Sequence, residues 1–245
     1  MFNCSKYQYY LNQTIARGEC RIRVIEFLRN TSHYSCCDWR KRKVMNSIEK
    51  FIDELTKQKN TTTVSNPYLE GGVAENLLNY LKYMMVIKGK RILLVGEAPG
   101  YKGCKITGIP FTSGRVFERV NHPVLQALKD KISLSKVEAE NTATIVWNYL
   151  SYKGVSPLFW NSYPFHPYPE GQEDKNRPPN PEEIEEGVKY LEAIYNLFKP
   201  DVIAGIGHSG VKCAERALPN IEIAYIRHPS FGGKTDFIKG MDKII

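Results

Sequence analysis

The chain has 245 residues, with 34 Lys and Arg against 26 Asp and Glu and a formal net charge of +8 at pH 7. This length suits one α/β domain with an appendage, and the positive balance favours a polyanionic partner. No apolar run reaches the length of a membrane span and the polar N-terminus is unlike a signal peptide, so we expect a soluble, cytoplasmic protein without a membrane partner. The six cysteines form no Cys-x-x-Cys pair, which argues against the common zinc and iron–sulfur sites.

The N-terminal residues differ in character from the rest of the chain. Residues 1–43 are basic and aromatic with weak periodicity, so we predict an extension there, with a short helix at 21–29, and a main domain over 44–245. Apolar positions 44, 48, 51, 52 and 55 form a stripe that predicts a helix over 44–57. A loop is expected over 58–66 and a second helix over 73–86.

Four strands are predicted along the main domain. The first, 91–95, is β-branched or leucine-rich without alternation, as in a strand covered on both faces. After a loop at 101–113 we expect a helix capped by Ser113 and kinked or split at Pro123, then a helix over 138–152. The remaining strands are predicted at 158–160, 201–205 and 221–226, with a loop at 162–181, helices at 182–198 and 208–217, and a short closing helix. This order predicts an α/β fold with three α/β/α layers and a central four-stranded parallel sheet.

Polar residues follow three of these strands. Gly96-Glu97-Ala98-Pro99-Gly100 leaves the first strand, Asn161 ends the second, and His228 follows the fourth. Parallel strands end at the same edge of a sheet, so these residues are expected to share one cleft with Phe111 from the loop. A carboxamide matches an imide edge, an aromatic ring stacks on a flat ring, and an imidazole stabilises charge on a carbonyl oxygen. The set predicts a site for a flat heterocycle.

These residues resemble the motifs of the uracil-DNA glycosylase superfamily, closest to its Gly-Glu-Ala-Pro-Gly branch. Residues 96–100 resemble the water-activating motif, and Gly108-Ile109-Pro110-Phe111 resembles the segment that supplies the stacking aromatic ring. Asn161 resembles the base-reading residue, and His228-Pro229-Ser230 resembles the second motif. The four motifs occur in the family's order, and the resemblance covers roughly residues 85–240.

The resemblance implies a monomeric hydrolase of base excision repair that removes uracil or a related deaminated base from DNA after flipping the nucleotide out. Phe111 would stack on the base beside Ala98, Asn161 would read the imide edge, and His228 would donate a hydrogen bond to O2 as negative charge develops there. Backbone phosphates and the vacated stack would be contacted by a further set of residues. That set is Pro99, Gly100, Ser230, Phe231 and Gly232.

The sequence departs from the family pattern at two points. Ala98 stands where the most active branch has a water-positioning Asp, so the resemblance assigns that role to Glu97, the nearest carboxylate. The Gly-Glu-Ala-Pro-Gly branch also holds an iron–sulfur cluster on four cysteines, which this sequence does not reproduce. We therefore expect no cluster, no metal and no other cofactor.

Two other functions stay open at this stage. Ala98 and the basic N-terminus also suit a non-catalytic DNA-binding relative. Residues 205–210 fit the Gly-x-Gly-x-x-Gly pattern of dinucleotide enzymes, and Arg227 at the end of the next strand would suit a 2′-phosphate. Among the other histidines, His33 and His122 are expected on the surface and His166 in a packed loop.

Overall fold

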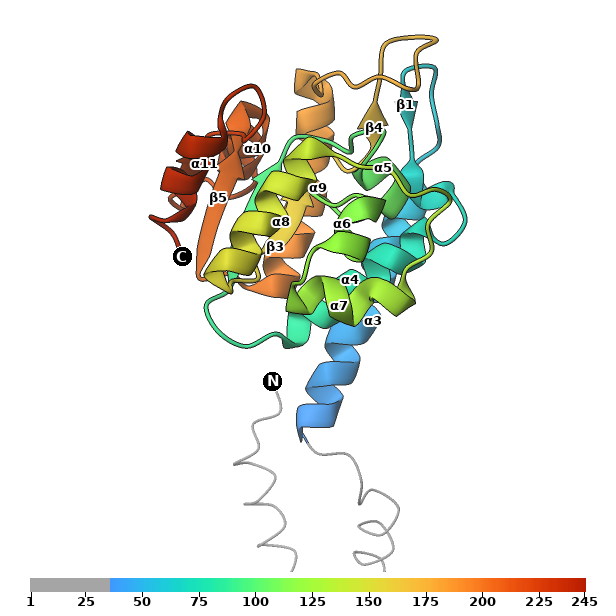
Figure 1. Cartoon of the computed structure of the whole chain (residues 1–245). Coiled ribbons are helices and arrows are strands. Elements are labelled where there is room, and N and C mark those ends of the chain that lie inside the picture. The colour runs from blue at the N-terminus through green and yellow to red at the C-terminus, as the bar shows by residue number, and fades with distance from the viewer. Residues whose placement is uncertain (1–35) are drawn as a thin grey trace, which may run out of the picture. The chain divides into compact units, whose positions relative to one another are not determined.

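The computed structural model describes residues 36–245, with side chains from residue 42 onward (Figure 1). Contacts divide the chain into one unit of Met1–Val44 and another of Met45–Ile245, and the fold below is that of the second unit. The expected helix at 21–29 and His33 lie outside the described residues. The separate character of residues 1–43 therefore stays a prediction.

The predicted four-stranded parallel sheet is confirmed. Its strands, in the spatial order β3-β2-β5-β6, are β3 (Leu158–Asn161), β2 (Ile92–Gly96), β5 (Val202–Ile206) and β6 (Ala224–Ile226). Gly96 pairs with Asn161 across β2 and β3, and Val95 pairs with Gly205 across β2 and β5. The carboxyl ends of β2, β3 and β5 are therefore level, which places the segments that follow these strands at one edge of the sheet.

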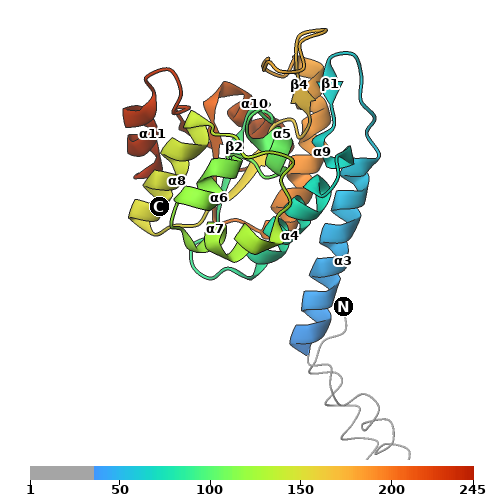
Figure 2. The ribbon, with the colours of Figure 1, turned by 45° about the vertical axis from the view of Figure 1, so that its right-hand side comes forward.

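Alternation along β3 shows how helices cover both faces of the sheet. Phe159 points to one face, where its ring centroid lies 5.9 Å from that of Trp147 in α8 (Asn141–Lys153). Trp160 points to the other, 5.3 Å from Phe51 of α3 (Cys36–Thr56). Helix α11 (Lys234–Met241) lies with α8, whereas α9 (Pro181–Phe198) and α10 (Gly207–Ala217) cover the opposite face (Figures 1 and 2). The predicted three layers are confirmed.

Other helices agree with the sequence in part. Helix α4 (Val73–Val86) has the predicted bounds, and the helix predicted after Ser113 is split as expected before Pro123, into α6 (Gly114–Arg119) and α7 (Pro123–Leu128). Helix α3 begins at Cys36, eight residues before the predicted start at 44. Short helices complete the chain: η1 (Pro67–Leu69), α5 (Cys104–Thr107) and η2 (Lys129–Lys131).

Three local expectations were wrong. Ser113 occupies the N-cap position of α6, but its side chain makes no capping bond and its hydroxyl is buried without a partner. His122 is 1% exposed, because its Nδ1 accepts a bond from the Val124 N–H at the start of α7 and its Nε2 lies 3.0 Å from the Val155 carbonyl oxygen. The two expected loops at 58–66 and 162–181 also pair as a small antiparallel sheet of β1 (Val64–Ser65) and β4 (His166–Pro167).

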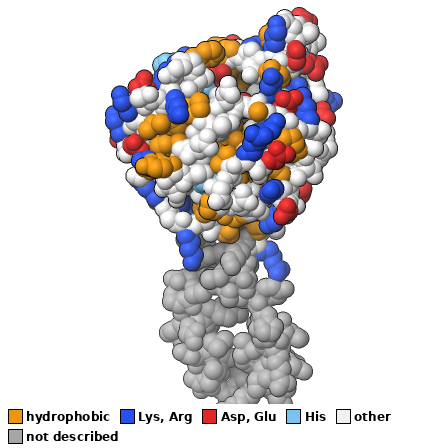
Figure 3. Space-filling view, in the orientation of Figure 1, with side chains coloured by type: hydrophobic (Ala, Val, Ile, Leu, Met, Phe, Trp, Pro, Cys, Tyr) orange, Lys and Arg blue, Asp and Glu red, His pale blue; other side chains and the backbone are white. Residues whose placement is uncertain are grey.

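The surface of the described part carries both signs of charge. On the face seen in Figure 3, basic and acidic side chains are interspersed and do not gather into one basic patch. None of the helices between Cys36 and Ile245 has the length and hydropathy needed to cross a membrane.

Candidate active site

A cleft of about 930 Å³ opens at the carboxyl ends of the sheet strands. Its lining comes from segments far apart in the sequence: the turn after β2, the loop before α6, the end of β3, and the segment after β6. Of the ten predicted site residues, nine line it: Glu97, Ala98, Pro99, Gly100, Phe111, Asn161, His228, Ser230 and Phe231. Gly232 is exposed next to Phe231 but does not line the cleft.

Phe111 and Asn161 meet over Gly96, the last residue of β2. A Cβ atom at Gly96 would lie 2.4 Å from Cε2 of Phe111 and 3.0 Å from Oδ1 of Asn161. Asn161 and Phe159 share a face of β3 because they are two residues apart, and the Phe159 ring lies 5.0 Å from that of Phe111. Glycine at position 96 therefore gives the ring and the carboxamide room to approach each other.

The backbone of Phe111 adopts an unusual conformation. Its φ of 57° lies in the left-handed region, which a bulky residue enters only at a cost of about 1–3 kcal/mol. The buried Trp147 donates its indole N–H to the Phe111 carbonyl over 2.8 Å and holds this conformation. The ring centroid of Phe111 then lies 6.2 Å from that of His228, with the two planes 38° apart. Strain of this kind is characteristic of binding sites.

The hydrogen bonds of His228 select one tautomer. The backbone N–H of Ser230 donates to Nδ1 over 3.2 Å, so Nδ1 carries a lone pair and the proton of the neutral ring is on Nε2. The Ser230 hydroxyl lies 2.7 Å from the same Nδ1 and donates to it as well. Burial and the neighbouring Arg227 charge lower the pKa of His228, so the ring is neutral at pH 7. His228 thus offers an uncharged Nε2–H donor inside the cleft.

The side chain of Glu97, in the turn after β2, lies beside the N-terminus of α10. The Ser209 hydroxyl in the first turn of this helix donates to Glu97 Oε2 over 3.2 Å, where the helix dipole also favours negative charge. The glycines of the 205–210 motif serve close contact: a Cβ at Gly210 would lie 2.0 Å from the Val95 carbonyl oxygen, and one at Gly205 2.4 Å from the Val211 nitrogen. A carboxylate in this place disfavours a second anion, such as a pyrophosphate.

The turn after β2 is held by buried polar groups. Ser162 donates its backbone N–H to the Gly96 carbonyl over 2.9 Å, and its hydroxyl donates to the Glu97 carbonyl over 2.6 Å. His166, which is fully buried, has Nδ1 2.7 Å from the Pro99 carbonyl oxygen. The prediction that His166 is packed is confirmed, although it lies in β4 and not in a loop, and it contributes to the site by fixing the turn.

Sequence reasoning missed an acid in the cleft. Glu140 precedes α8 and is half-buried, and a Cβ at Gly103 would lie 2.2 Å from its Oε2. Burial raises the pKa of Glu140 from 4.5 to about 7. Burial and the Glu140 charge in turn raise the pKa of the Cys104 thiol, whose sulfur accepts a weak bond from Asn161 Nδ2 over 3.8 Å. The polar stretch before residue 141 has no periodicity that would indicate this position.

Further residues that line the cleft were not assigned to it from the sequence, which offered residues 205–210 and Arg227 only for a dinucleotide. They are Thr142, Asn176, Arg177, Pro178, Ile206, Gly207, His208, Ser209, Tyr225 and Arg227. Arg177 is already paired, with both terminal nitrogens bonded to the Glu183 carboxylate at 2.6 and 2.7 Å. Tyr225 and Arg227 are two residues apart at the end of the last strand, so their side chains lie on the same side of the chain. This alternation could have indicated that both face the site that His228 enters. Among the side chains described, those of residues 42–245, no three His, Cys, Asp or Glu gather to hold a metal ion.

Comparison with known proteins agrees with this architecture. The crystal structure of wild-type Pedobacter heparinus SMUG2 is similar, with a TM-score of 0.58 and 15% sequence identity, over 80% of this chain and 95% of that chain. No curated protein gives a significant match. The model of the uracil DNA glycosylase superfamily matches residues 86–239, which span all four motifs and the cleft. The chain therefore belongs to the uracil-DNA glycosylase superfamily.

Proposed function

We propose that the protein is a DNA glycosylase that hydrolyses the N-glycosidic bond of uracil or a related deaminated base in DNA. The observation that carries the proposal is the convergence of Phe111, Asn161 and His228 in one cleft at the strand ends. An aromatic ring, a carboxamide and a neutral imidazole donor match the face, the imide edge and the O2 atom of one pyrimidine. Family membership over residues 86–239 supports the same reaction class.

His228 would supply the electrostatic part of the reaction. The target nucleotide leaves the stack and its base enters the cleft, with its face on Phe111 and its imide edge at Asn161. As the bond to the sugar breaks, the electron pair moves to the base and charge accumulates on O2. The Nε2–H of His228 donates to that oxygen, and one such donor typically lowers the barrier by about 3 kcal/mol. Because Ser230 uses its hydroxyl hydrogen on Nδ1, we assign it to positioning His228 more than to holding a phosphate.

Water would reach the sugar cation beside Glu97. This carboxylate is exposed at the cleft and is oriented by Ser209. Ala98 contributes only its methyl group and the backbone of the turn, so Glu97 is our assignment for positioning the water.

The remaining DNA contacts are assigned to the rim. Phe231 is 98% exposed with φ of 50°, which suits a wedge that enters the stack vacated by the flipped base. Gly100 and Gly232 offer backbone N–H groups to phosphates on either side of it, whereas Pro99 has no N–H and its carbonyl is bonded to His166, so we assign Pro99 to shaping the turn. The cleft is complete within one chain, so we propose that the protein acts as a monomer.

The proposal is tested by base release. The protein is incubated with an oligonucleotide that holds one uracil, in U:G, U:A and single-stranded form, and the products are treated with alkali. We expect strand cleavage at the uracil in at least one form. The assignment would be overturned if none of the three uracil substrates is cleaved and matching oligonucleotides with hypoxanthine or xanthine are not cleaved either.

A second candidate is a non-catalytic DNA-binding relative, which Ala98 favours because it cannot orient water. Such a protein binds the same oligonucleotides, with an affinity that falls steeply as salt rises, yet releases no base. Measuring both binding and release on one substrate separates the two candidates. The dinucleotide alternative loses support from the Glu97 carboxylate at the start of α10, and a titration with NADPH that shows no binding would remove it.

A further inference from the structure

The cleft carries an aromatic pair that the proposed reaction does not use. The rings of His208 and Tyr225 stack, with centroids 5.3 Å apart and planes 29° apart. Both residues line the cleft, His208 at the start of α10 and Tyr225 in the middle of β6. His208 is exposed and Tyr225 is 49% exposed, so this pair presents aromatic surface to solvent beside the base-binding residues.

Tyr225 has few neighbours within the described part of the protein. Strand β6 is the last strand of the sheet, so one flank of it pairs with no other strand. Among the described residues, nothing hydrogen-bonds the Tyr225 hydroxyl. The pair therefore rests on neither a buried core nor a polar network.

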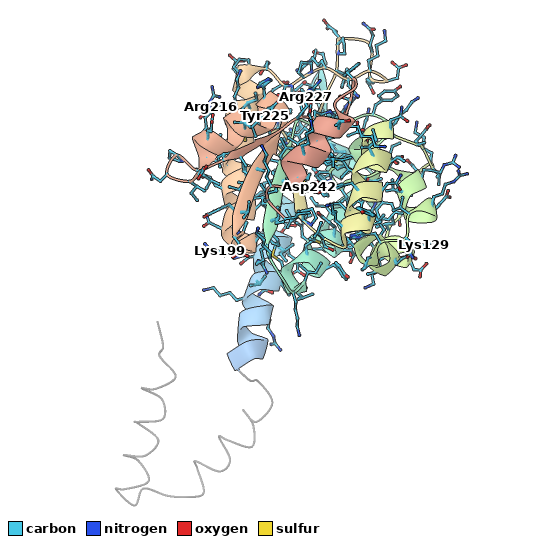
Figure 4. The ribbon with its side chains drawn as sticks, turned by 60° about the vertical axis from the view of Figure 1, so that its left-hand side comes forward. Lys129, Lys199, Arg216, Tyr225, Arg227 and Asp242 are labelled. Carbon is cyan, nitrogen blue, oxygen red and sulfur yellow. The ribbon has the colours of Figure 1, made fainter. Side chains whose placement is uncertain are left out.

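A positive charge lies beside the pair. Arg227 is two residues after Tyr225, so alternation places both side chains on the same side of the chain, and both line the cleft (Figure 4). The Arg227 guanidinium donates to the His228 carbonyl over 3.2 Å, and within residues 42–245 it forms no ion pair with an acid. A fixed cation without a counter-ion next to a stacked aromatic surface has the chemistry that a nucleotide requires.

We propose that His208 and Tyr225 form a stacking step for an unpaired nucleobase adjacent to the flipped one, while Arg227 neutralises the phosphate between the two nucleotides. The inference rests on the proposed function, because DNA in the cleft is what brings a neighbouring base to this rim. In a duplex that neighbour is held by its own partner and stack, whereas in a single strand it is free to move onto the aromatic pair. The step therefore selects single-stranded DNA over duplex.

The test measures binding, so that base release does not enter the readout. The probe is a single-stranded oligonucleotide with one tetrahydrofuran abasic analogue flanked by 2-aminopurine, and the same strand in a duplex. Tyr225→Ala is expected to weaken single-strand binding on the order of 10-fold, the usual effect of removing one base-stacking ring, and to change duplex binding by less than about twofold. Quenching of 2-aminopurine is expected with wild type and Tyr225→Trp and not with Tyr225→Ala. Tyr152→Ala is the matched control, because Tyr152 is 84% exposed on α8 and lies outside the cleft.

A salt series separates the two components of the subsite. Arg227→Gln should reduce the slope of log affinity against log salt by about 0.7 on the single strand, as expected for one phosphate contact, while Tyr225→Ala leaves the slope unchanged. The inference is overturned if Tyr225→Ala weakens both DNA forms equally, changes neither, or behaves like Tyr152→Ala. A protein that shows the expected binding pattern but releases no base would contradict the proposed glycosylase reaction and leave the stacking step in place.

Discussion

Glu140 gives a quantitative test of the cleft because partial removal of its carboxylate from water costs free energy. Its pKa is raised from 4.5 to about 7, and the difference corresponds to about 3 kcal/mol against the ionised form in the folded protein. Since the side chain retains some contact with solvent, screening reduces this to about 2–3 kcal/mol. Between pH 4.5 and 7 the folded state binds more protons at this group than the unfolded state, so Glu140 lowers the free energy of unfolding as pH rises. Glu140→Gln removes that dependence.

The assay is urea unfolding of wild type and Glu140→Gln at pH 5, 6, 7 and 8. The free energy of unfolding of the variant, relative to wild type, should increase by about 2 kcal/mol or more from pH 5 to pH 8, with little of the rise beyond pH 7. Buried histidines titrate in both proteins and cancel in the difference. Glu170→Gln, at an exposed glutamate outside the cleft, is the control for the substitution itself. A flat difference for Glu140→Gln would refute the reasoning, since the carboxyl group would then be well solvated.

Three further predictions follow from the same geometry. Gly96→Ala introduces a methyl group that meets the Phe111 ring, so base release should fall at least about 10-fold, whereas Gly71→Ala, with no atom within 4 Å of the new Cβ, should have no effect. Ala98→Asp places a carboxylate in the cleft and should raise the single-turnover rate of base release by about 10-fold or more. Burial lowers the pKa of His122 below 6.5, so the folded state resists protonation, and stability present above pH 6.5 is lost as pH falls. Thermal unfolding of wild type between pH 7.5 and 5.5 should show this loss, and His122→Gln should show a shallower one.

Each of these has a result that would contradict it. Gly96→Ala with a wild-type rate would mean that the ring and carboxamide need not meet above β2. An Ala98→Asp variant slower than wild type would mean that water is not limiting at this position. Equal acid sensitivity of wild type and His122→Gln would place the proton uptake on another group.

The sequence predicted the parts of the fold that repeat simple patterns. The strands were found because each is a short apolar run followed by Gly, Asn or a polar turn, and Val73–Val86 was found because its apolar stripe has helical spacing. The motif residues were predicted to share a cleft for the same reason, since strand ends in a parallel sheet meet at one edge. The geometry of that cleft agrees with this expectation, although the role of each residue stays a proposal.

The missed features depend on contacts between distant segments. The pairing of β1 with β4 involves two residues on each side, too few to leave a local signal. The burial of His122 follows from its bond to the Val155 carbonyl, 33 residues away. Glu140 entered the cleft because Gly103 leaves space for its carboxylate, which neither segment reveals alone.

The most direct test of the central claim is the single-turnover rate of uracil release by wild type and by His228→Ala, each measured beside its affinity for the same DNA. Loss of one hydrogen-bond donor worth about 3 kcal/mol predicts a rate at least about 100-fold lower, with the dissociation constant changed by less than about threefold. Uracil released at equal rates by the two proteins would contradict the assignment of the cleft as the site of base excision.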